Sequence, residues 1–221
     1  MEQKRVKIIL LGPPGAGKGT QAEIISETLA IPTISTGAMI REAIAEGSEI
    51  GKQAKAIVES GGLLPDETVI GIVKERIAKP DCVNGFILDG FPRTVAQAEA
   101  LNAMNVDIDA ALLITVDDET IIARMSGRRV CGKCGATFHV LYNAPKSDDV
   151  CDKCGATLTI RADDQPNVVK DRLDSYHAQT EPLIAFYKEL GKLKTVVGQE
   201  KLEDTTALTK KAIDEIVSGK N

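Results

Sequence analysis

The sequence has no long hydrophobic run, no excess of basic charge and few histidines. Its longest apolar run, Ala110–Ile114, is far shorter than the roughly 18 residues that a membrane-spanning helix requires. The formal net charge is −5, and non-specific binding of nucleic acid requires a basic surface instead. The two histidines, His139 and His177, are expected to pack or to lie at the surface. We therefore expect neither a membrane nor a nucleic-acid partner.

An export signal is also not expected. The apolar stretch nearest the N-terminus, residues 8–11, is followed at once by Gly12, so it is too short for the core of a signal peptide. We therefore expect a cytoplasmic protein. In that reducing compartment, cysteines are more often metal ligands or free thiols than disulfides.

The 221 residues are enough for one large domain, or for one domain that carries an insertion. Apolar strands are predicted at residues 6–11, 33–35, 86–89, 110–116 and 193–197, and helical stretches lie between them, the longest at 166–190. This alternation predicts an α/β fold, with a parallel sheet covered by helices on both faces. Residues 127–164 are rich in small polar residues and cysteines, which indicates an inserted small domain.

A glycine-rich phosphate-loop motif follows the first predicted strand and precedes a helix. Gly12, Gly17 and Lys18 stand at the spacing G-x-x-x-x-G-K, which is typical of loops whose backbone N–H groups bind phosphate. The general motif has Ser or Thr directly after the lysine, but here Gly19 precedes Thr20. The alternative is a plain strand–helix turn, and the register of the glycines with the lysine favours phosphate binding.

Charged residues at the ends of predicted segments also point to phosphate binding. Asp89 ends an apolar strand, where phosphoryl-transfer folds place an acid in the magnesium shell, although many other strands also end in Asp. Several arginines lie near turns: Arg41, Arg93, Arg124, Arg128, Arg129, Arg161 and Arg172. Planar guanidinium groups can neutralise two phosphate chains that must meet, but surface arginines are usually only solvated.

Four cysteines form the pattern C-x2-C-x16-C-x2-C: Cys131, Cys134, Cys151 and Cys154. This spacing predicts a four-thiolate zinc site. Four protein ligands leave no open position, so the metal would be structural. Redox pairs or free thiols are the alternative, and iron in place of zinc is left open. Cys82 has no neighbour in the sequence and is expected to be a small packed residue.

In combination these motifs resemble the adenylate kinase family over about residues 6–197. The matching stretches are residues 12–20, 34–37, 84–93, 127–130 and 161–164. The resemblance implies a P-loop three-layer α/β fold with a parallel-sheet core formed by residues 1–34, 65–126 and 165–221. It also implies a small helical AMP-binding domain at 35–64. The cysteines are similar to those of the bacterial subgroup whose lid, here residues 127–164, resembles a zinc ribbon.

The activity implied by the resemblance is the reversible reaction of MgATP with AMP to give two ADP, in a monomer that uses Mg²⁺ and a structural Zn²⁺. The acceptor is a phosphate oxygen that is already largely ionised near neutral pH, so no general base is required. Catalysis then consists of alignment and charge neutralisation. A closing lid would exclude water as the competing nucleophile.

The resemblance also implies roles for individual residues. The ATP site would consist of Gly15, Ala16, Gly17, Lys18, Gly19, Thr20, Arg124, Arg128, Thr137, Phe138 and a backbone carbonyl near Glu200. The AMP site would consist of Thr36, Arg41, Gly62, Leu63, Leu64, Gly90, Phe91, Pro92, Arg93, Gln97, Arg161 and Arg172, with Gln97 reading the base. The catalytic set would be Lys18, Asp89, Arg93, Arg128, Arg161 and Arg172. Asp163 would help to hold the lid closed.

The chain departs from the family at Ala38, where Asp is usual, which affects hydrogen bonding beside the AMP site. Two alternatives remain. A kinase for another nucleoside monophosphate would share the fold, although Gln97 and the lid cysteines favour adenine. A P-loop switch or a zinc-ribbon nucleic-acid binder is disfavoured by the acidic net charge and the set of arginines.

Overall fold

The central feature of the molecule is a parallel sheet. The computed structural model describes residues 5–219, so residues 1–4 and 220–221 of the predicted core lie outside it. Within the described range the sheet has five strands in the order β2-β3-β1-β4-β8. They are β1 (Val6–Leu11), β2 (Thr33–Ser35), β3 (Gly85–Asp89), β4 (Ala110–Thr115) and β8 (Leu193–Val197). The predicted parallel α/β sheet is therefore confirmed.

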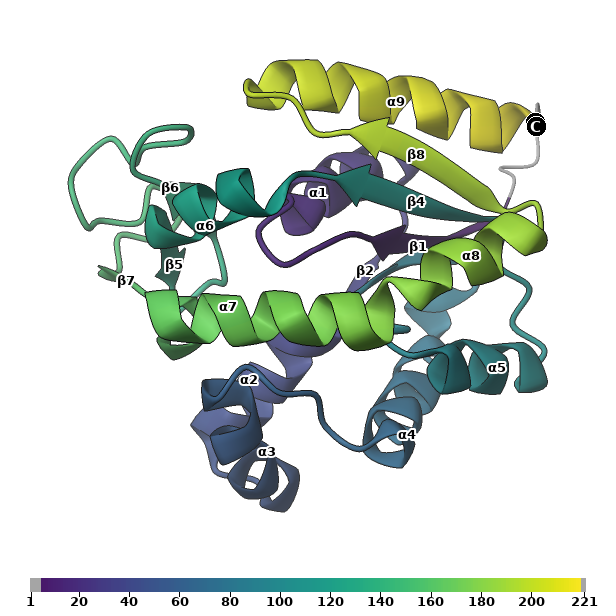
Figure 1. Cartoon of the computed structure of the whole chain (residues 1–221), viewed down its shortest axis with the longest axis horizontal. Helices are drawn as coiled ribbons and strands as arrows, with labels where there is room; N and C mark the ends of the chain where they lie inside the picture. The colour runs from purple at the N-terminus through teal and green to yellow at the C-terminus, as the bar shows by residue number, and fades with distance from the viewer. Residues whose placement is uncertain (1–4, 220–221) are drawn as a thin grey trace.

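Helices cover both faces of this sheet (Figure 1). Side chains alternate along β1, so that Ile8 and Leu10 contact one core cluster and Ile9 and Leu11 the other, as the period of two along a strand requires. The first cluster includes residues of α1 (Lys18–Leu29) and α9 (Leu202–Ser218), and the second includes residues of α5 (Val95–Ala103) and α8 (Pro182–Glu189). These layers bury both faces of the strands.

The helical stretch predicted at 166–190 is divided. It consists of α7 (Pro166–Ser175), a π-helical turn, η3 (Tyr176–Thr180), and α8. The wider i→i+5 register of the turn appears in the hydrogen bond from the Glu181 N–H to the Tyr176 carbonyl, at 2.9 Å. Such turns are rare and often lie beside functional sites, and this one contacts a loop discussed below.

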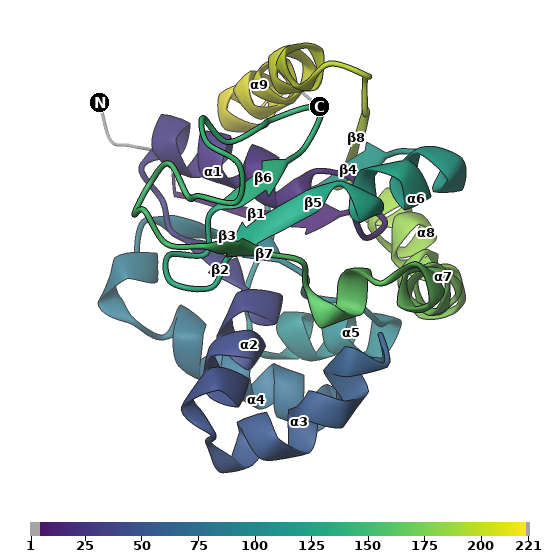
Figure 2. The same cartoon turned by 90° about the vertical axis from the view of Figure 1, so that its left-hand side faces the viewer.

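A helical group lies below the sheet in Figure 2. It contains α2 (Thr36–Glu46), α3 (Glu49–Glu59) and α4 (Asp66–Ile77), and a short 3-10 turn, η1 (Pro80–Cys82), follows it. Ser48 begins α3 as its N-cap, where its hydroxyl accepts a hydrogen bond from the Gly51 N–H at 3.1 Å. α2 and α3 fall within residues 35–64. α6 (Asp118–Ser126) follows β4 in the chain. Asp117 is its N-cap, and the Asp117 carboxylate accepts a hydrogen bond from the Thr120 N–H at 2.8 Å.

Residues 127–164 form a separate small sheet. Its antiparallel strands lie in the order β6-β5-β7, with β5 at Arg128–Cys131, β6 at Thr137–His139 and β7 at Leu158–Thr159, and the 3-10 turn η2 (Ala162–Asp164) follows. The buried core of this sheet is small: Cys131, Ala136, Phe138, Cys151 and Leu158. A core of this size gives little hydrophobic stabilisation, so a sheet this small is expected to need a bound metal ion for its stability.

The four cysteines of the predicted zinc site meet in this small sheet. Their sulfur atoms all lie within 4.8 Å of one another, and within residues 5–219 no other group of His, Cys, Asp or Glu is placed to hold a metal ion in this way. The pairs Cys131–Cys154 and Cys134–Cys151 are 3.4 and 3.5 Å apart. Backbone N–H groups of Cys134 and Lys133 lower the pKa of Cys131 to about 6, which favours the thiolate that a metal binds, whereas hydrogen bonds with the neighbouring cysteines raise the pKa of Cys134 to about 12. The donor set fits tetrahedral zinc.

The apolar helical segments of the described residues are too short to cross the thickness of a membrane. Among the described residues, no helix is both long enough and apolar enough to span a bilayer.

Replacing Cys151 and Cys154 with Ser is expected to abolish stoichiometric zinc binding and to lower Tm by roughly 5 °C or more, since ~1 kcal/mol shifts Tm of a chain of this size by ~2–4 °C. Limited proteolysis should then cut first within residues 127–164. Zinc content, calorimetry and mapping of the cut sites measure the three effects.

Cys82→Ala is the matched control, because Cys82 is buried outside the cluster and its replacement should leave the zinc content unchanged. An unchanged Tm and cleavage pattern in the Cys151/Cys154 variant would contradict a structural role for the metal.

Candidate active site

The candidate site lies at the carboxyl ends of three neighbouring strands. The register pairs Leu10 of β1 with Asp89 of β3, and Asp89 with Ser35 of β2. The loop after β1, the start of α2 at Thr36 and the loop after Asp89 therefore converge at one edge of the sheet. This is the edge at which open α/β sheets bind ligands.

The loop between β1 and α1 adopts a conformation that requires glycine. Gly12, Gly15 and Gly17 have φ angles of 136°, 80° and 91°, which other residues rarely adopt. Gly17 is the N-cap of α1, so Lys18, Gly19 and Thr20 form the first helical turn. The Lys18 ammonium donates hydrogen bonds to the carbonyls of Gly12 and Pro13, both at 2.7 Å. The Lys18 side chain therefore bonds back to the first residues of the predicted phosphate loop. The N-terminus of α1, at the end of this loop, favours binding of an anion.

Lys18 lies in surroundings that disfavour its positive charge. Its pKa is lowered to about 8, mainly by burial and in addition by the positive charges of Arg93, Arg172 and Arg128, while Asp89 opposes the shift. Burial without full pairing disfavours the charged form. A bound anion would therefore be stabilised strongly by this ammonium group.

The arginines form one partly buried positive cluster. Burial is the main cause that lowers the pKa of Arg41, Arg93, Arg161 and Arg172, and that of Arg161 falls to about 9. Each also feels the positive charge of at least one other arginine. Positive charges packed together in this way are stabilised by a polyanion that brings negative charge between them.

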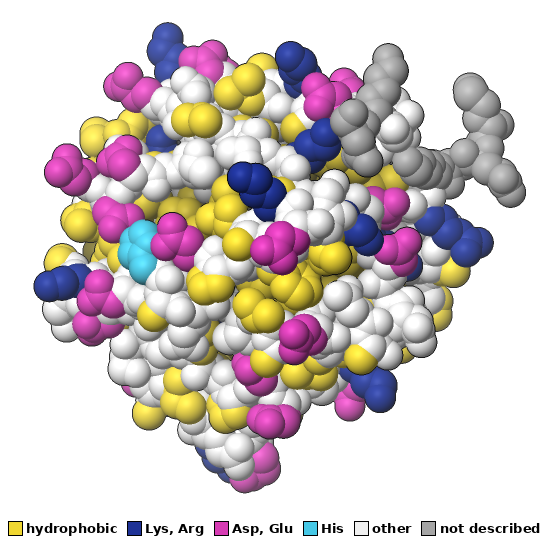
Figure 3. Space-filling model, turned by 45° about the vertical axis from the view of Figure 1, so that its right-hand side comes forward, with side chains coloured by type: hydrophobic (Ala, Val, Ile, Leu, Met, Phe, Trp, Pro, Cys, Tyr) yellow, Lys and Arg dark blue, Asp and Glu magenta, His cyan; other side chains and the backbone are white. Residues whose placement is uncertain are grey.

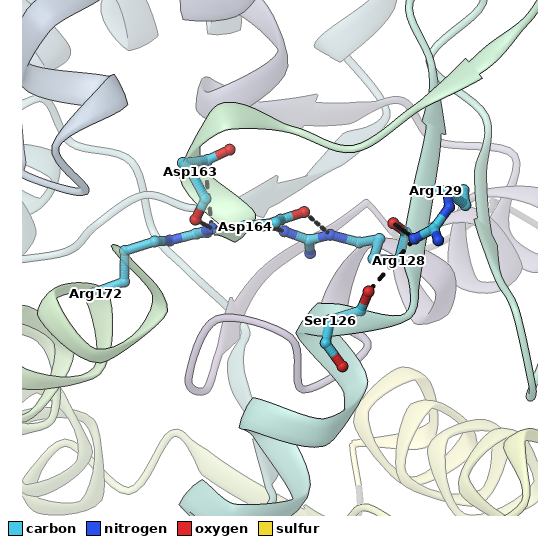
Figure 4. Close-up of polar contacts among 6 residues, drawn as sticks. All are labelled: Ser126, Arg128, Arg129, Asp163, Asp164 and Arg172. Carbon is cyan, nitrogen blue, oxygen red and sulfur yellow. Dashed lines mark hydrogen bonds and ion pairs between the residues drawn. The ribbon is translucent and has the colours of Figure 1, made fainter. Parts of the chain in front are cut away.

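Asp164 joins Arg172 of this cluster to Arg128 (Figure 4). Its side chain is fully buried; one oxygen accepts from Arg128 Nε at 2.7 Å, and the other contacts the Nη2 of Arg128 and accepts from Arg172 at 2.9 Å. Arg172 also pairs with Asp163 at 3.0 Å. Arg129 is bonded instead to the carbonyls of Arg128 and Ser126. The sequence motifs predicted no role for Asp164. Its position next to Asp163 is the only feature of the sequence that pointed to it.

A pocket lies beside the cluster, between the helical group and the sheet. Its lining includes most of the residues assigned to AMP by resemblance: Thr36, Arg41, Gly62, Leu63, Leu64, Gly90, Arg93, Gln97 and Arg172. Phe91, Pro92 and Arg161 do not line it; Phe91 instead packs in the core, fully buried. Ala38 is exposed in the first turn of α2 and is not part of the lining.

The residues assigned to the ATP site beyond the phosphate loop lie outside this pocket, on α6, in the small sheet and in the loop after β8. Arg124 on α6 donates to the Gln199 carbonyl at 2.7 Å, next to the exposed Glu200, and its guanidinium lies 5.9 Å from the centre of the Tyr142 ring. The Phe138 side chain is buried in the core of the cysteine sheet, whereas Thr137 is exposed. Phe138 can therefore offer its backbone, rather than its ring, to a ligand.

Two residues that no motif indicated hold the loop around Arg93. Thr180, at the end of the π-helical turn, donates its hydroxyl proton to the Arg93 carbonyl at 2.8 Å. Asp66, at the start of α4, accepts hydrogen bonds from the side chains of Gln97 and Thr94. Both contacts join segments far apart in the sequence, so no spacing pattern could predict them.

Comparison with known proteins agrees with this geometry. The family model described as Adenylate kinase matches residues 10–192. The chain is 54% identical over 212 residues to an adenylate kinase of Caldicellulosiruptor saccharolyticus, covering 94% of this chain and 99% of the relative. It is 52% identical over 205 residues to one of Acetivibrio thermocellus (91% and 94%) and 53% identical over 203 residues to one of Clostridium botulinum (90% and 94%). With its phosphate loop and arginine cluster in place, the chain therefore belongs to the adenylate kinase family of phosphotransferases.

Proposed function

We propose that this chain transfers the terminal phosphate of MgATP to AMP, with ATP on the Gly12–Lys18 loop and AMP in the pocket beside it. One observation carries the assignment of the two sites. Arg172 lines the pocket and also lies close enough to Lys18 to lower its pKa. A phosphate chain on the loop and a second phosphate in the pocket would therefore meet at the same guanidinium.

On the ATP side, the backbone N–H groups from Gly15 to Thr20 would bind the phosphates, and Lys18 would leave its carbonyl partners to contact them. Arg124 and the backbone at Thr137, Phe138 and Glu200 would hold the adenosine. Asp89 and Thr20 would supply oxygen atoms to hold Mg²⁺ and its water shell. That ion neutralises charge on the β- and γ-phosphates when it is bound.

On the AMP side, Thr36, Arg41, Arg93 and the backbone of residues 62–64 would surround the nucleotide, with Gly90, Phe91 and Pro92 shaping the loop. Gln97 would read the base. Support comes from the pocket, whose lining includes Thr36, Arg41, residues 62–64, Gly90, Arg93 and Gln97, and from the Arg93 Nε, which donates to the Gly90 carbonyl at 2.9 Å. A guanidinium held by the loop needs little reorganisation when phosphate binds.

Transfer would need no proton-transfer residue, because the acceptor phosphate oxygen is already ionised. Arg128, Arg161 and Arg172 would neutralise the charge as the phosphates approach. Residues 127–164 would act as the lid, 35–64 as the AMP-binding domain, and the rest as the core. Closure of the lid would exclude water, which competes with AMP for the phosphate.

The chain would work as a cytoplasmic monomer on small nucleotides, without nucleic acid or membrane. A reducing compartment keeps the four cysteines from forming disulfides, so that they remain able to bind zinc. On the face shown in Figure 3, acidic and basic side chains are interspersed with hydrophobic ones. That face therefore presents no continuous basic stripe, the feature on which nucleic-acid binding depends.

The direct test is ADP formation from MgATP with AMP, UMP, CMP and GMP in parallel assays. We expect strong activity with AMP, and replacement of Arg172 by Ala should lower kcat/KM by at least about 100-fold, because it removes charge stabilisation of the transition state. Preference for another monophosphate would retain the reaction but overturn the substrate. ATP binding without transfer to any of them would instead indicate a nucleotide-dependent switch.

The pKa of Lys18 predicts proton uptake when MgATP binds. At pH 8 about half of the free chains carry a neutral Lys18, and phosphate oxygens favour its charged form, so binding should take up about half a proton. The apparent affinity should then fall as the pH rises above 8. Calorimetry in buffers of different ionisation enthalpy measures the uptake. Lys18→Met serves as the control, and equal uptake by this variant would contradict the assignment.

A further inference from the structure

We propose that Asp66 fixes the orientation of the Gln97 side-chain amide and thereby makes the pocket selective for adenine over a 6-oxopurine base. This inference rests on the proposed role of Gln97 in reading the base of AMP. Asp66 does not line the pocket, so it acts as a positioning residue through Gln97 rather than by touching the nucleotide.

The amide of Gln97 is held at both of its polar atoms. Its Oε1 accepts a hydrogen bond from the Arg93 backbone N–H at 2.7 Å, and its Nε2 donates to Asp66 Oδ1, also at 2.7 Å. The side chain is only 1% exposed, so water cannot readily replace either partner. Turning the amide over would place two donors against each other at Arg93 and two acceptors against each other at Asp66. A buried mismatch of that kind is costly.

Asp66 is itself fixed in place. It begins α4, where the helix N-terminus favours a negative charge. Both of its oxygens accept from the Thr94 hydroxyl, at 3.2 and 3.1 Å. The Thr94 hydroxyl in turn caps α5 by accepting from the Gln97 N–H at 3.2 Å. Asp66, Thr94 and Gln97 thus form a closed ring of hydrogen bonds between α4 and α5, in which an ionised Asp66 can only accept.

The fixed amide leaves one N–H and one oxygen lone pair free for a ligand. The contacts with Asp66 and the Arg93 N–H determine on which side each of them lies. Adenine presents a 6-amino donor beside the N1 acceptor, and this pattern complements an oxygen held on one side and an N–H on the other. Hypoxanthine and guanine present the opposite pattern, a 6-oxo acceptor beside an N1–H donor. They could bind to Gln97 only if the amide turned over, which Asp66 and the Arg93 N–H oppose. Unpaired polar groups of this kind give strong discrimination.

The test compares AMP with IMP, because the two differ only at the edge that Gln97 would face. We expect Asp66→Ala to lower the ratio of kcat/KM for AMP to that for IMP by about tenfold, the effect of one hydrogen bond to a charged group. The change should lie in KM for the monophosphate, and KM for ATP should remain unchanged. Asp66→Asn, which keeps an acceptor for Gln97 Nε2, should retain most of the selectivity.

Glu67→Ala is the matched control, since Glu67 is an exposed acid in the same helical turn and its removal should leave the ratio unchanged. Should Asp66→Ala not fold, Asp66→Ser keeps a helix-start hydroxyl that is too short to reach Gln97, and it should show the same loss. Equal decreases with AMP and IMP would indicate a merely structural role and overturn the proposal. Wild-type protein without AMP activity, or Gln97→Ala with an unchanged KM for AMP, would instead contradict the proposed function on which the inference rests.

Discussion

The concentration of positive charge at one edge of the sheet is the constraint on which the rest of the site depends. Lys18, Arg41, Arg93, Arg161 and Arg172 all have pKa values lowered mainly by burial. Holding these charges together costs free energy in the chain without ligand, and two carboxylates and several backbone carbonyls offset part of it. A site of this kind is organised for highly charged ligands before they arrive, so little reorganisation remains for the reaction itself.

The sequence was sufficient to predict features that local chemistry determines. The glycines around Lys18 need φ angles that few other residues adopt, and the apolar runs at 6–11 and 110–115 are too uniform to be surface segments. The two cysteine pairs are short-range motifs, and their spacing implied that they would meet. Family resemblance supplied most of the residues around the pocket, which line it together as expected.

The sequence was not sufficient where a contact joins distant segments. Arg128 and Asp164 are 36 residues apart, and Asp66 and Gln97 are 31 apart, so neither pair follows a helical or strand period. The π-helical turn at 176–180 was not predicted because its sequence contains no glycine or proline that would mark a change in the helix. Phe138 could not be recognised as a core residue because two of its partners in the small core, Cys151 and Leu158, lie far from it along the chain.

The ion pair between Arg128 and Asp164 has a mechanical consequence. Arg128 stands where the chain enters the small sheet, and Asp164 stands where the chain leaves it. Their pairing therefore joins the two chain segments that connect the small sheet to the rest of the molecule. In the function proposed above, a phosphate that takes Arg128 away from Asp164 would release this restraint, so phosphate binding would be thermodynamically linked to movement of residues 127–164. The guanidinium that binds the phosphate would then also be the group that restrains the small sheet.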